Sequence, residues 1–285
     1  MKKKHLTFFI IIIINICCIY GQRDTVINVN DVSFNLIYIK GGTFRMGVYG
    51  DTLLKQIDPK LAIYNVYNVE KSVTVSDFYI METEVTQELW VKIMKYNPSF
   101  HKGRDLPVEN VTWREGVRFC KRLNRKTGLR FRLPTKAEWE YAAIGGCNNM
   151  DYLYAGSNIL DSVAWYFNNS YVESHQVKQL KPNQLGLYDM SGNVGEWCLD
   201  ISCPSRDTTH VTNPQGPGKR EAKKIRSEFY GSYDKDRYKI FRVVSGGYFS
   251  GDWSSCVPSV HGHRLEIRKG RNPAIGFRVV LPTAP

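Results

Sequence analysis

The chain has 285 residues, of which 42% are hydrophobic and 23% are charged, and its formal net charge is +12. A folded chain of this length buries about 70% of the surface that it exposes when unfolded. The composition excludes a disordered chain, a collagen-like chain and a polytopic membrane protein, and no run of like charge is long enough to be a nucleic-acid-binding arm.

The N-terminus predicts an export signal over residues 1–21. Lysines at 2–4 form a charged start, a mostly apolar run extends over 6–20, and the small Gly21 follows it. This run is too short for a typical membrane span, whereas its charged start and small C-terminal residue are typical of a cleaved signal peptide. We therefore expect an exported protein of the periplasm or cell surface, with one domain over residues 22–285.

Two alternatives to cleavage stay open. The apolar run could be retained as an anchor, or Cys17 or Cys18 could carry a lipid, although bulky Ile16 stands before Cys17 where a small residue is expected. The expected partner is an envelope protein or a peptide, and an outer-membrane association or an anionic glycan would also suit the positive charge. We expect no nucleic-acid partner, because nucleic acid is not met outside the cytoplasm.

Five cysteines follow the predicted signal, and their pairing is left open by the sequence. An oxidising compartment permits disulfides, but an odd number leaves at least one thiol free or paired between chains. Cys198 and Cys203 are close enough in sequence to close a small loop, and the absence of a CxxC pair argues against a zinc ribbon. The five are Cys120, Cys147, Cys198, Cys203 and Cys256.

Short strands are expected in the first part of the chain. The apolar stretch 36–39 predicts a strand that ends at a Gly-Gly pair, and 44–47 predicts a second strand paired with the first through that turn. Residues 51–67 are of mixed character and include a proline, so we expect a surface loop. Residues 73–80 predict the next strand.

Three helices are expected from their capping residues. Thr86 precedes a segment whose apolar residues recur one turn apart. Thr112 and Thr135 each open a capping box, in which the threonine accepts a hydrogen bond from the third amide and a glutamate reaches back. Gly128 ends the second helix, and a Gly-Gly pair at 145–146 ends the third.

The second half of the chain predicts a loop-rich region and a basic insertion. Asn, Gly, Ser, Asp and Tyr dominate up to residue 200, and strands are expected again at 242–249 and 275–280. An exposed basic insertion is expected at about 204–241, where aromatic and basic residues interleave as they do at interfaces. It is a candidate partner surface, with a solvated loop as the alternative. Its aromatic residues are Phe229, Tyr230, Tyr233, Tyr238 and Phe241.

Seven short motifs occur in the same order as in the sulfatase-modifying factor family, which the chain resembles. The founding member of that family is the formylglycine-generating enzyme. The resemblance implies a single compact α+β domain with little regular secondary structure, a variant of the C-type lectin fold. The motifs occupy residues 41–47, 84–87, 107–113, 132–143, 186–197, 245–247 and 276–278.

The resemblance also implies where oxidase chemistry would lie. Formylglycine-generating enzymes oxidise a substrate cysteine with copper held by two thiolates, ligands that suit Cu(I). Their positions correspond here to Gly251 and Cys256, so one ligand is missing. Tyr248 and Ser255 replace a serine and a tyrosine that the family places nearby. We therefore expect a non-catalytic binding or assembly module of the bacterial envelope.

The alternative is a copper-dependent oxidoreductase of the formylglycine-generating type, which acts on a cysteine in a peptide with Cys256 as its catalytic residue. His261 and His263 follow Cys256 closely enough to complete a Cu or Zn site. The other interpretation of these residues is that the two histidines are ordinary loop residues and that Cys256 is a small buried hydrophobic residue.

A structural calcium ion is the second implication of the resemblance. Its ligands would be the side chain of Asp189, the carbonyls of Gly192 and Val194, and the side chain of Glu196. Hard oxygen donors in a glycine-containing loop suit Ca²⁺. The alternative is that both carboxylates accept hydrogen bonds from loop amides. A calcium-dependent glycan binder is a third functional hypothesis, which rests on analogy with lectins.

Overall fold

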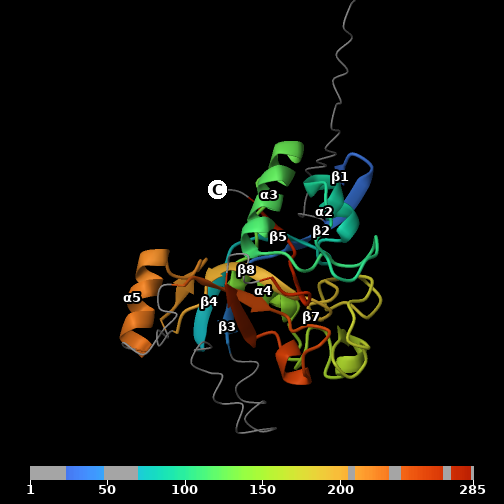
Figure 1. Cartoon of the computed structure of the whole chain (residues 1–285). Coiled ribbons are helices and arrows are strands. Elements are labelled where there is room, and N and C mark those ends of the chain that lie inside the picture. Colours follow the sequence, from blue (N-terminus) through green and yellow to red (C-terminus); the bar gives the residue numbers. More distant parts are fainter. Residues whose placement is uncertain (1–23, 48–69, 205–208, 231–238, 266–270, 284–285) are drawn as a thin grey trace, which may run out of the picture.

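The computed structural model describes residues 24–47, 70–204, 209–230, 239–265 and 271–283. The predicted export signal and the predicted loop at 51–67 lie outside these ranges. Within them, short strands and a few helices form one domain in which long loops connect the sheets (Figure 1). None of the described helices is long and apolar enough to cross a membrane.

The first sheet joins the two ends of the described chain. Its four strands are all antiparallel to their neighbours, in the order β1-β2-β5-β13. The strand expected at 36–39 is confirmed, and it begins earlier than expected because its apolar alternation starts at Val32. The strands are β1 (Thr25–Val29), β2 (Val32–Ile39), β5 (Phe78–Met81) and β13 (Val280–Pro282).

The second sheet differs from the predicted strand pairing. β3 (Gly42–Met46) pairs with β4 (Lys71–Val75), so the hairpin expected between 36–39 and 44–47 is wrong. The chain leaves the first sheet at Gly41, where a Cβ would lie 2.4 Å from the carbonyl of Val75, too close for any side chain. β9 (Val211–Thr212) completes the order β3-β4-β9.

The strand expected at 73–80 is broken into β4 and β5. Asp77 lies at the break, where its carboxylate accepts hydrogen bonds from the Gly41 amide at 2.8 Å and the Tyr38 hydroxyl at 2.5 Å. Such side-chain bonds to backbone offer the chain an alternative to a continuous ladder.

The third sheet holds the C-terminal motifs, in the order β11-β10-β8-β12. β10 stops at Ser245 because Gly246 and Gly247 adopt φ of 98° and 72°, which a strand cannot continue through. The strand expected at 275–280 splits into β12 and β13. The elements are β8 (Gly195–Ile201), β10 (Phe241–Ser245), β11 (His261–Leu265) and β12 (Ile275–Gly276), with a separate two-stranded ladder of β6 (Ala164–Trp165) and β7 (Ser191–Gly192).

All three capped helices are confirmed. The Thr86 hydroxyl accepts from the Leu89 amide at 3.3 Å, and both predicted capping boxes are formed. Gly128 ends α3 in the left-handed conformation with φ of 74°. The helices are α2 (Gln87–Met94), α3 (Trp113–Thr127) and α4 (Lys136–Ala143), with 3₁₀ turns at η2 (Gly146–Asn148), η3 (Leu160–Ser162) and η5 (Trp253–Cys256).

The basic insertion contains a helix, α5 (Lys219–Tyr230), which the expectation of an exposed insertion did not include. Its apolar face is anchored, since Ala222 is buried and the Arg226 guanidinium lies 5.0 Å over the ring of Phe241. Phe229 and Phe241 are half-buried, so they do not form an exposed aromatic surface. The remaining tyrosines of the predicted surface are not described: Tyr233 and Tyr238 lie outside the described residues, as does the side chain of Tyr230.

Two apolar clusters form the core. One packs α2 and α3 on the first sheet, with the rings of Trp90, Phe119 and Phe277 at centroid distances of 5.3–6.0 Å. The other surrounds α4, all of whose residues are buried. Motif residues belong to both clusters, among them Phe277 in the first and Trp139 in the second.

Candidate functional site

Cys256, the retained thiol of the copper position, is closed off from solvent. It ends the 3₁₀ turn η5 and packs in an apolar cluster with Tyr154 and Val163. The Sγ lies 3.8 Å from the Asp252 carbonyl. Burial raises the pKa of the Cys256 thiol to about 12. Because the thiolate is the nucleophile and the metal ligand, burial disfavours the reactive form of this thiol.

Gly251 occupies the position of the missing ligand, and the fold is closed around it. Its amide donates to the Tyr248 carbonyl at 2.8 Å, and its own carbonyl accepts from the Phe167 amide at 3.0 Å. A Cβ at this position would lie 2.6 Å from the Ser255 hydroxyl. A side chain at position 251 would therefore require the Ser255 hydroxyl to move.

No second thiol or ligand cluster compensates for Gly251 in the described part of the chain. The five cysteines of the described ranges are all unpaired, including Cys198 and Cys203. No group of three His, Cys, Asp or Glu side chains among the described residues could hold a metal ion. The side chains of His261 and His263 lie outside the described residues, so a Cys256–histidine site stays a prediction.

The family motifs converge on a buried ion pair between Arg278 and Glu196. Both side chains are completely buried, and the Arg278 Nε lies 2.9 and 2.8 Å from the two Glu196 oxygens. The Arg278 Nη2 donates to Glu196 Oε1 at 2.8 Å, and the Trp139 indole donates to Oε2 at 2.9 Å. Every oxygen of the Glu196 carboxylate thus has a protein donor.

The remaining N–H groups of Arg278 tie the sheets together. Nη1 donates to the carbonyls of Met81 at 3.1 Å and Glu82 at 3.3 Å, and Nη2 donates to that of Tyr188 at 2.9 Å. Arg278 therefore joins the end of β5, the loop before β7 and strand β8. These motif residues therefore build one buried junction.

Glu84 and Asp189 form a second carboxyl pair at this junction. Burial and the Asp189 charge raise the pKa of Glu84 well above its ordinary value, and burial raises that of Asp189 to about 6. No donor reaches either Glu84 oxygen. Asp189, in contrast, accepts a hydrogen bond from the Lys178 amide at 2.9 Å.

These contacts do not fit the calcium ion implied by the resemblance. The Glu196 oxygens face a guanidinium and an indole, and Asp189 faces Glu84 and a loop amide. Arg278 already supplies the positive charge that the carboxylates need. The carbonyls of Gly192 and Val194 lie in the turn that leads from β7 to β8. Calcium binding stays a prediction, and chelation tests it.

A set of exposed apolar side chains comes from loops that contact residues 249–251 through His101, Phe167 and Ser170. We call it the aromatic loop face. The exposed fractions are 72% for Phe100, 58% for Phe167, 89% for Tyr171 and 49% for Val172. Ring contacts link Phe100 to His101 at 5.1 Å and His101 to Phe249 at 5.4 Å. Exposed aromatic side chains of this kind are the usual anchors of protein interfaces.

The backbone of the aromatic loop face is strained. Tyr171 and Val172 have φ of 55° and 60°, a region that a β-branched valine rarely enters and that costs about 1–3 kcal/mol per residue. The Ser170 hydroxyl holds this turn: it donates to the Phe249 carbonyl at 2.6 Å and accepts from the Val172 amide at 3.1 Å. The turn thus presents Tyr171 to solvent on a fixed backbone.

A stacked pair of rings contacts the same turn through the Ser170 carbonyl. The rings of Trp165 and His175 lie 3.8 Å apart and nearly parallel, and the His175 Nε2 is 2.9 Å from the Ser170 carbonyl. The His175 amide donates to Asn193 Oδ1 at 2.9 Å. Sequence reasoning missed this face, because exposure depends on how distant loops meet. The only signal was the aromatic-rich, loop-forming composition.

Comparisons with known proteins identify the family. A model described as the sulfatase-modifying factor enzyme 1-like domain matches residues 28–283. A chaperone protein LppX of Paenibacillus barcinonensis is 35% identical over an alignment of 221 positions, which covers 59% of this chain and 72% of that protein. A formylglycine-generating enzyme of Streptomyces coelicolor is 31% identical over an alignment of 150 positions, which covers 47% of this chain and 46% of the enzyme. The chain thus matches less than half of that enzyme's length.

Solved structures agree with this assignment. Treponema denticola variable protein 1 is 28% identical, has a TM-score of 0.74, and matches 92% of this chain and 100% of its own. PvdO of Pseudomonas aeruginosa, with 18% identity and a TM-score of 0.66, shares the fold over 92% of this chain and 100% of its own. The single α+β domain and the position of its motifs show that the chain belongs to the sulfatase-modifying factor family.

Proposed function

We propose that this protein is an exported binding or assembly module of the bacterial envelope that lacks oxidase chemistry. One observation carries the proposal: the copper position holds Gly251 and a single buried thiol whose pKa is raised to about 12. Two-thiolate Cu(I) sites need two soft ligands, and here the fold supplies a single thiol, that of Cys256, which is buried. The motifs that are retained serve the buried junction at Arg278.

The aromatic loop face is the proposed binding surface. Its large side chains are exposed on a backbone that is held in a strained conformation, an arrangement that lowers the entropic cost of binding. A similar protein is named a chaperone, which would also work by binding another protein. The partner expected for this surface is an envelope protein or a peptide.

A capture experiment tests the proposal. The mature wild-type protein, a Tyr171→Ser variant and a Val26→Ser control are immobilised and exposed to envelope extract of the source bacterium, and bound proteins are identified by mass spectrometry. Val26 is an exposed apolar residue on β1. We expect one protein captured by wild type and control and lost with Tyr171→Ser. Equal capture by all three would contradict the proposed surface.

Export is part of the proposal and has its own test. Expression of the full chain followed by cell fractionation should place the protein outside the cytoplasm, with Gln22 as its first residue. A cytoplasmic, uncleaved protein would contradict export, and lipid on Cys17 or Cys18 would replace cleavage after Gly21 by the lipid-anchored alternative.

Glycan binding is the second candidate, because exposed aromatic rings also suit sugars, and its calcium dependence is the part that the contacts of Asp189 and Glu196 do not favour. A glycan array probed with and without EDTA separates it from protein binding. Glycan signals that need calcium and are lost with Tyr171→Ser would favour this candidate over a protein partner.

A further inference from the structure

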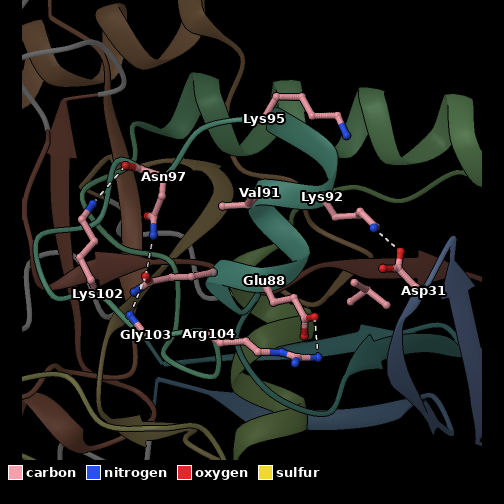
Figure 2. A pocket seen from close by; sticks show the side chains of 11 residues that line it. Asp31, Glu88, Val91, Lys92, Lys95, Asn97, Lys102, Gly103 and Arg104 are labelled. Carbon is pink, nitrogen blue, oxygen red and sulfur yellow. Dashed lines mark hydrogen bonds and ion pairs between the residues drawn. The ribbon is translucent and has the colours of Figure 1, made fainter.

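A second recognition site lies beside α2, away from the copper position. The outward face of this helix carries Glu88, Val91, Lys92 and Lys95, which recur at helical spacing, whereas the opposite face is buried in the core. Val91, which is 40% exposed, lies on this outward face between the charged side chains. Figure 2 shows the side chains around the resulting hollow of about 770 Å³, which we call the α2 hollow.

The α2 hollow has a wall on each side of the helix. The turn between β1 and β2 forms one wall with Asp31 and Val32, and the loop 97–104 forms the other. Figure 2 shows the side chains of both walls on either side of the helix. The hollow is therefore open to solvent along the helix and bounded on its two flanks.

Positive charge exceeds negative charge in the α2 hollow. Its cations are Lys92, Lys95, Lys102 and Arg104, and its carboxylates are Asp31 and Glu88. Lys92 forms an ion pair with Asp31, and Arg104 Nη2 lies 2.6 Å from Glu88 Oε1. Neither Lys95 nor Lys102 forms an ion pair with a described residue, although Lys102 is near enough to Glu109 to lower the pKa of that carboxyl.

The helix itself explains only part of this charge. Cations near a helix C-terminus interact favourably with the helix dipole, which accounts for Lys92 and Lys95. Lys102 and Arg104 belong to the loop, so the dipole does not account for them. Lys102 Nζ donates to the Asn97 carbonyl at 3.1 Å, which directs its ammonium group across the loop.

One buried side chain fixes the loop wall. Gln87 accepts hydrogen bonds from Asn97 Nδ2 at 2.7 Å and the Gly103 amide at 3.2 Å. Its Nε2 donates to the carbonyls of His101 at 2.8 Å and Pro107 at 3.1 Å. The loop cations are thus held on a rigid backbone, which lowers the cost of ordering them when a ligand binds.

We infer that the α2 hollow binds a protein segment that carries Asp or Glu side chains beside an apolar one. The acidic residues would meet Lys95 and Lys102, and the apolar residue would cover Val91. Both carboxylates of the hollow are paired with a cation, so its excess positive charge is confined to Lys95 and Lys102. A polymer that is anionic at every unit, such as a sulfated glycan, carries more negative charge than these two groups can complement. The charge pattern therefore favours a peptide with localised negative charge.

The inference rests on the proposed binding role and deepens it. The loop 97–104 also carries Phe100, so a partner seated on the aromatic loop face reaches the α2 hollow by crossing this loop. The two surfaces share one wall but no anchor residue, and they can be tested separately.

Fluorescence anisotropy with a defined probe tests the inference. The probe is a labelled peptide in which Glu and Leu alternate, and the protein is the full mature chain. Lys95→Glu and Lys102→Glu should each raise Kd about tenfold, because charge reversal replaces an exposed attraction by repulsion of similar size. Val91→Asp should also weaken binding. Lys223→Glu, an equal charge change on exposed α5, is the control and should leave Kd within twofold.

The outcomes separate this inference from the proposed function. Absent peptide binding, or equal Kd for all variants shown by circular dichroism to be folded, would overturn the α2 hollow as a site. Displacement of the peptide by heparin at lower concentration than by unlabelled peptide would overturn the choice of a peptide partner. Loss of envelope capture with Tyr171→Ser beside unchanged peptide binding would uphold both surfaces, whereas capture unaffected by Tyr171→Ser would refute the aromatic loop face alone.

Discussion

Replacing Arg278 by methionine should strongly destabilise the protein. Arg278→Met keeps most of the side-chain length and removes the donors to Glu196 and to three backbone carbonyls. Glu196 would then be a buried charge whose only remaining side-chain donor is Trp139. Breaking a buried ion pair from one side costs about 3–5 kcal/mol.

The expected fall in Tm follows from that free energy. For a domain of this size each kcal/mol lowers Tm by about 2–4 °C, so Arg278→Met should lower it by about 6–20 °C. Differential scanning calorimetry and urea unfolding measure both quantities. Arg104→Met, which removes an exposed cation, is the matched control and should cost less than about 1 kcal/mol.

A double variant separates the lost charge pair from lost packing. Glu196→Gln in the Arg278→Met background removes the unpaired charge but keeps an acceptor for Trp139, so it should restore part of the stability. Arg278→Met within about 1 kcal/mol of wild type would refute the assignment of Arg278 as the central cation of this junction. Rescue of Arg278→Met by added calcium would instead show that the carboxylates hold that ion.

Further predictions concern calcium, pH, backbone strain and copper. EDTA should leave the wild-type Tm unchanged, and a fall that calcium reverses would contradict the protein-only contacts of Glu196. Burial raises the pKa of Glu109 from 4.5 to about 7. The contribution of the protonated acid to the free energy of unfolding is therefore complete below about pH 4.5 and is lost as pH rises through 7. Between pH 5 and pH 8 the free energy of unfolding of Glu109→Gln, measured with urea, should therefore fall by about 1–2 kcal/mol less than that of wild type. An equal dependence on pH for the two proteins would contradict this. Val172→Gly should change stability by less than about 1 kcal/mol, because relief of the left-handed strain offsets the entropy of glycine; a larger loss on urea unfolding would argue against that strain. Gly251→Cys with Ser255→Ala, which clears the clash at the new Cβ, should gain Cu(I) affinity in a competition titration, and no gain would show that more than ligand number is missing.

The helices were predictable from the sequence because their capping signals are local. Thr112 and Thr135 each lie three residues from the glutamate that completes the box. The pairing of β3 was mispredicted because Gly41 serves a close approach to another strand, which sequence proximity does not reveal. The helix in the basic insertion was missed because net charge concealed its anchored face at Ala222.

Prediction of the site was also limited to features that are local in the sequence. The resemblance pointed to position 251 and to Glu196, but Arg278 lies 82 residues from its carboxylate partner. A sequence that brings acidic motif residues together predicts a cation, and an arginine meets that need as well as a metal does. The strained turn at Val172 was not predictable, because a β-branched residue argues against positive φ.

Titration of the mature protein with Cu(I) in competition with a calibrated chelator tests the central claim most directly. A binding module with one protonated, buried thiol at the copper position should take up no stoichiometric Cu(I) at neutral pH. Tight one-to-one binding that Cys256→Ala abolishes would contradict the account and would favour an oxidase.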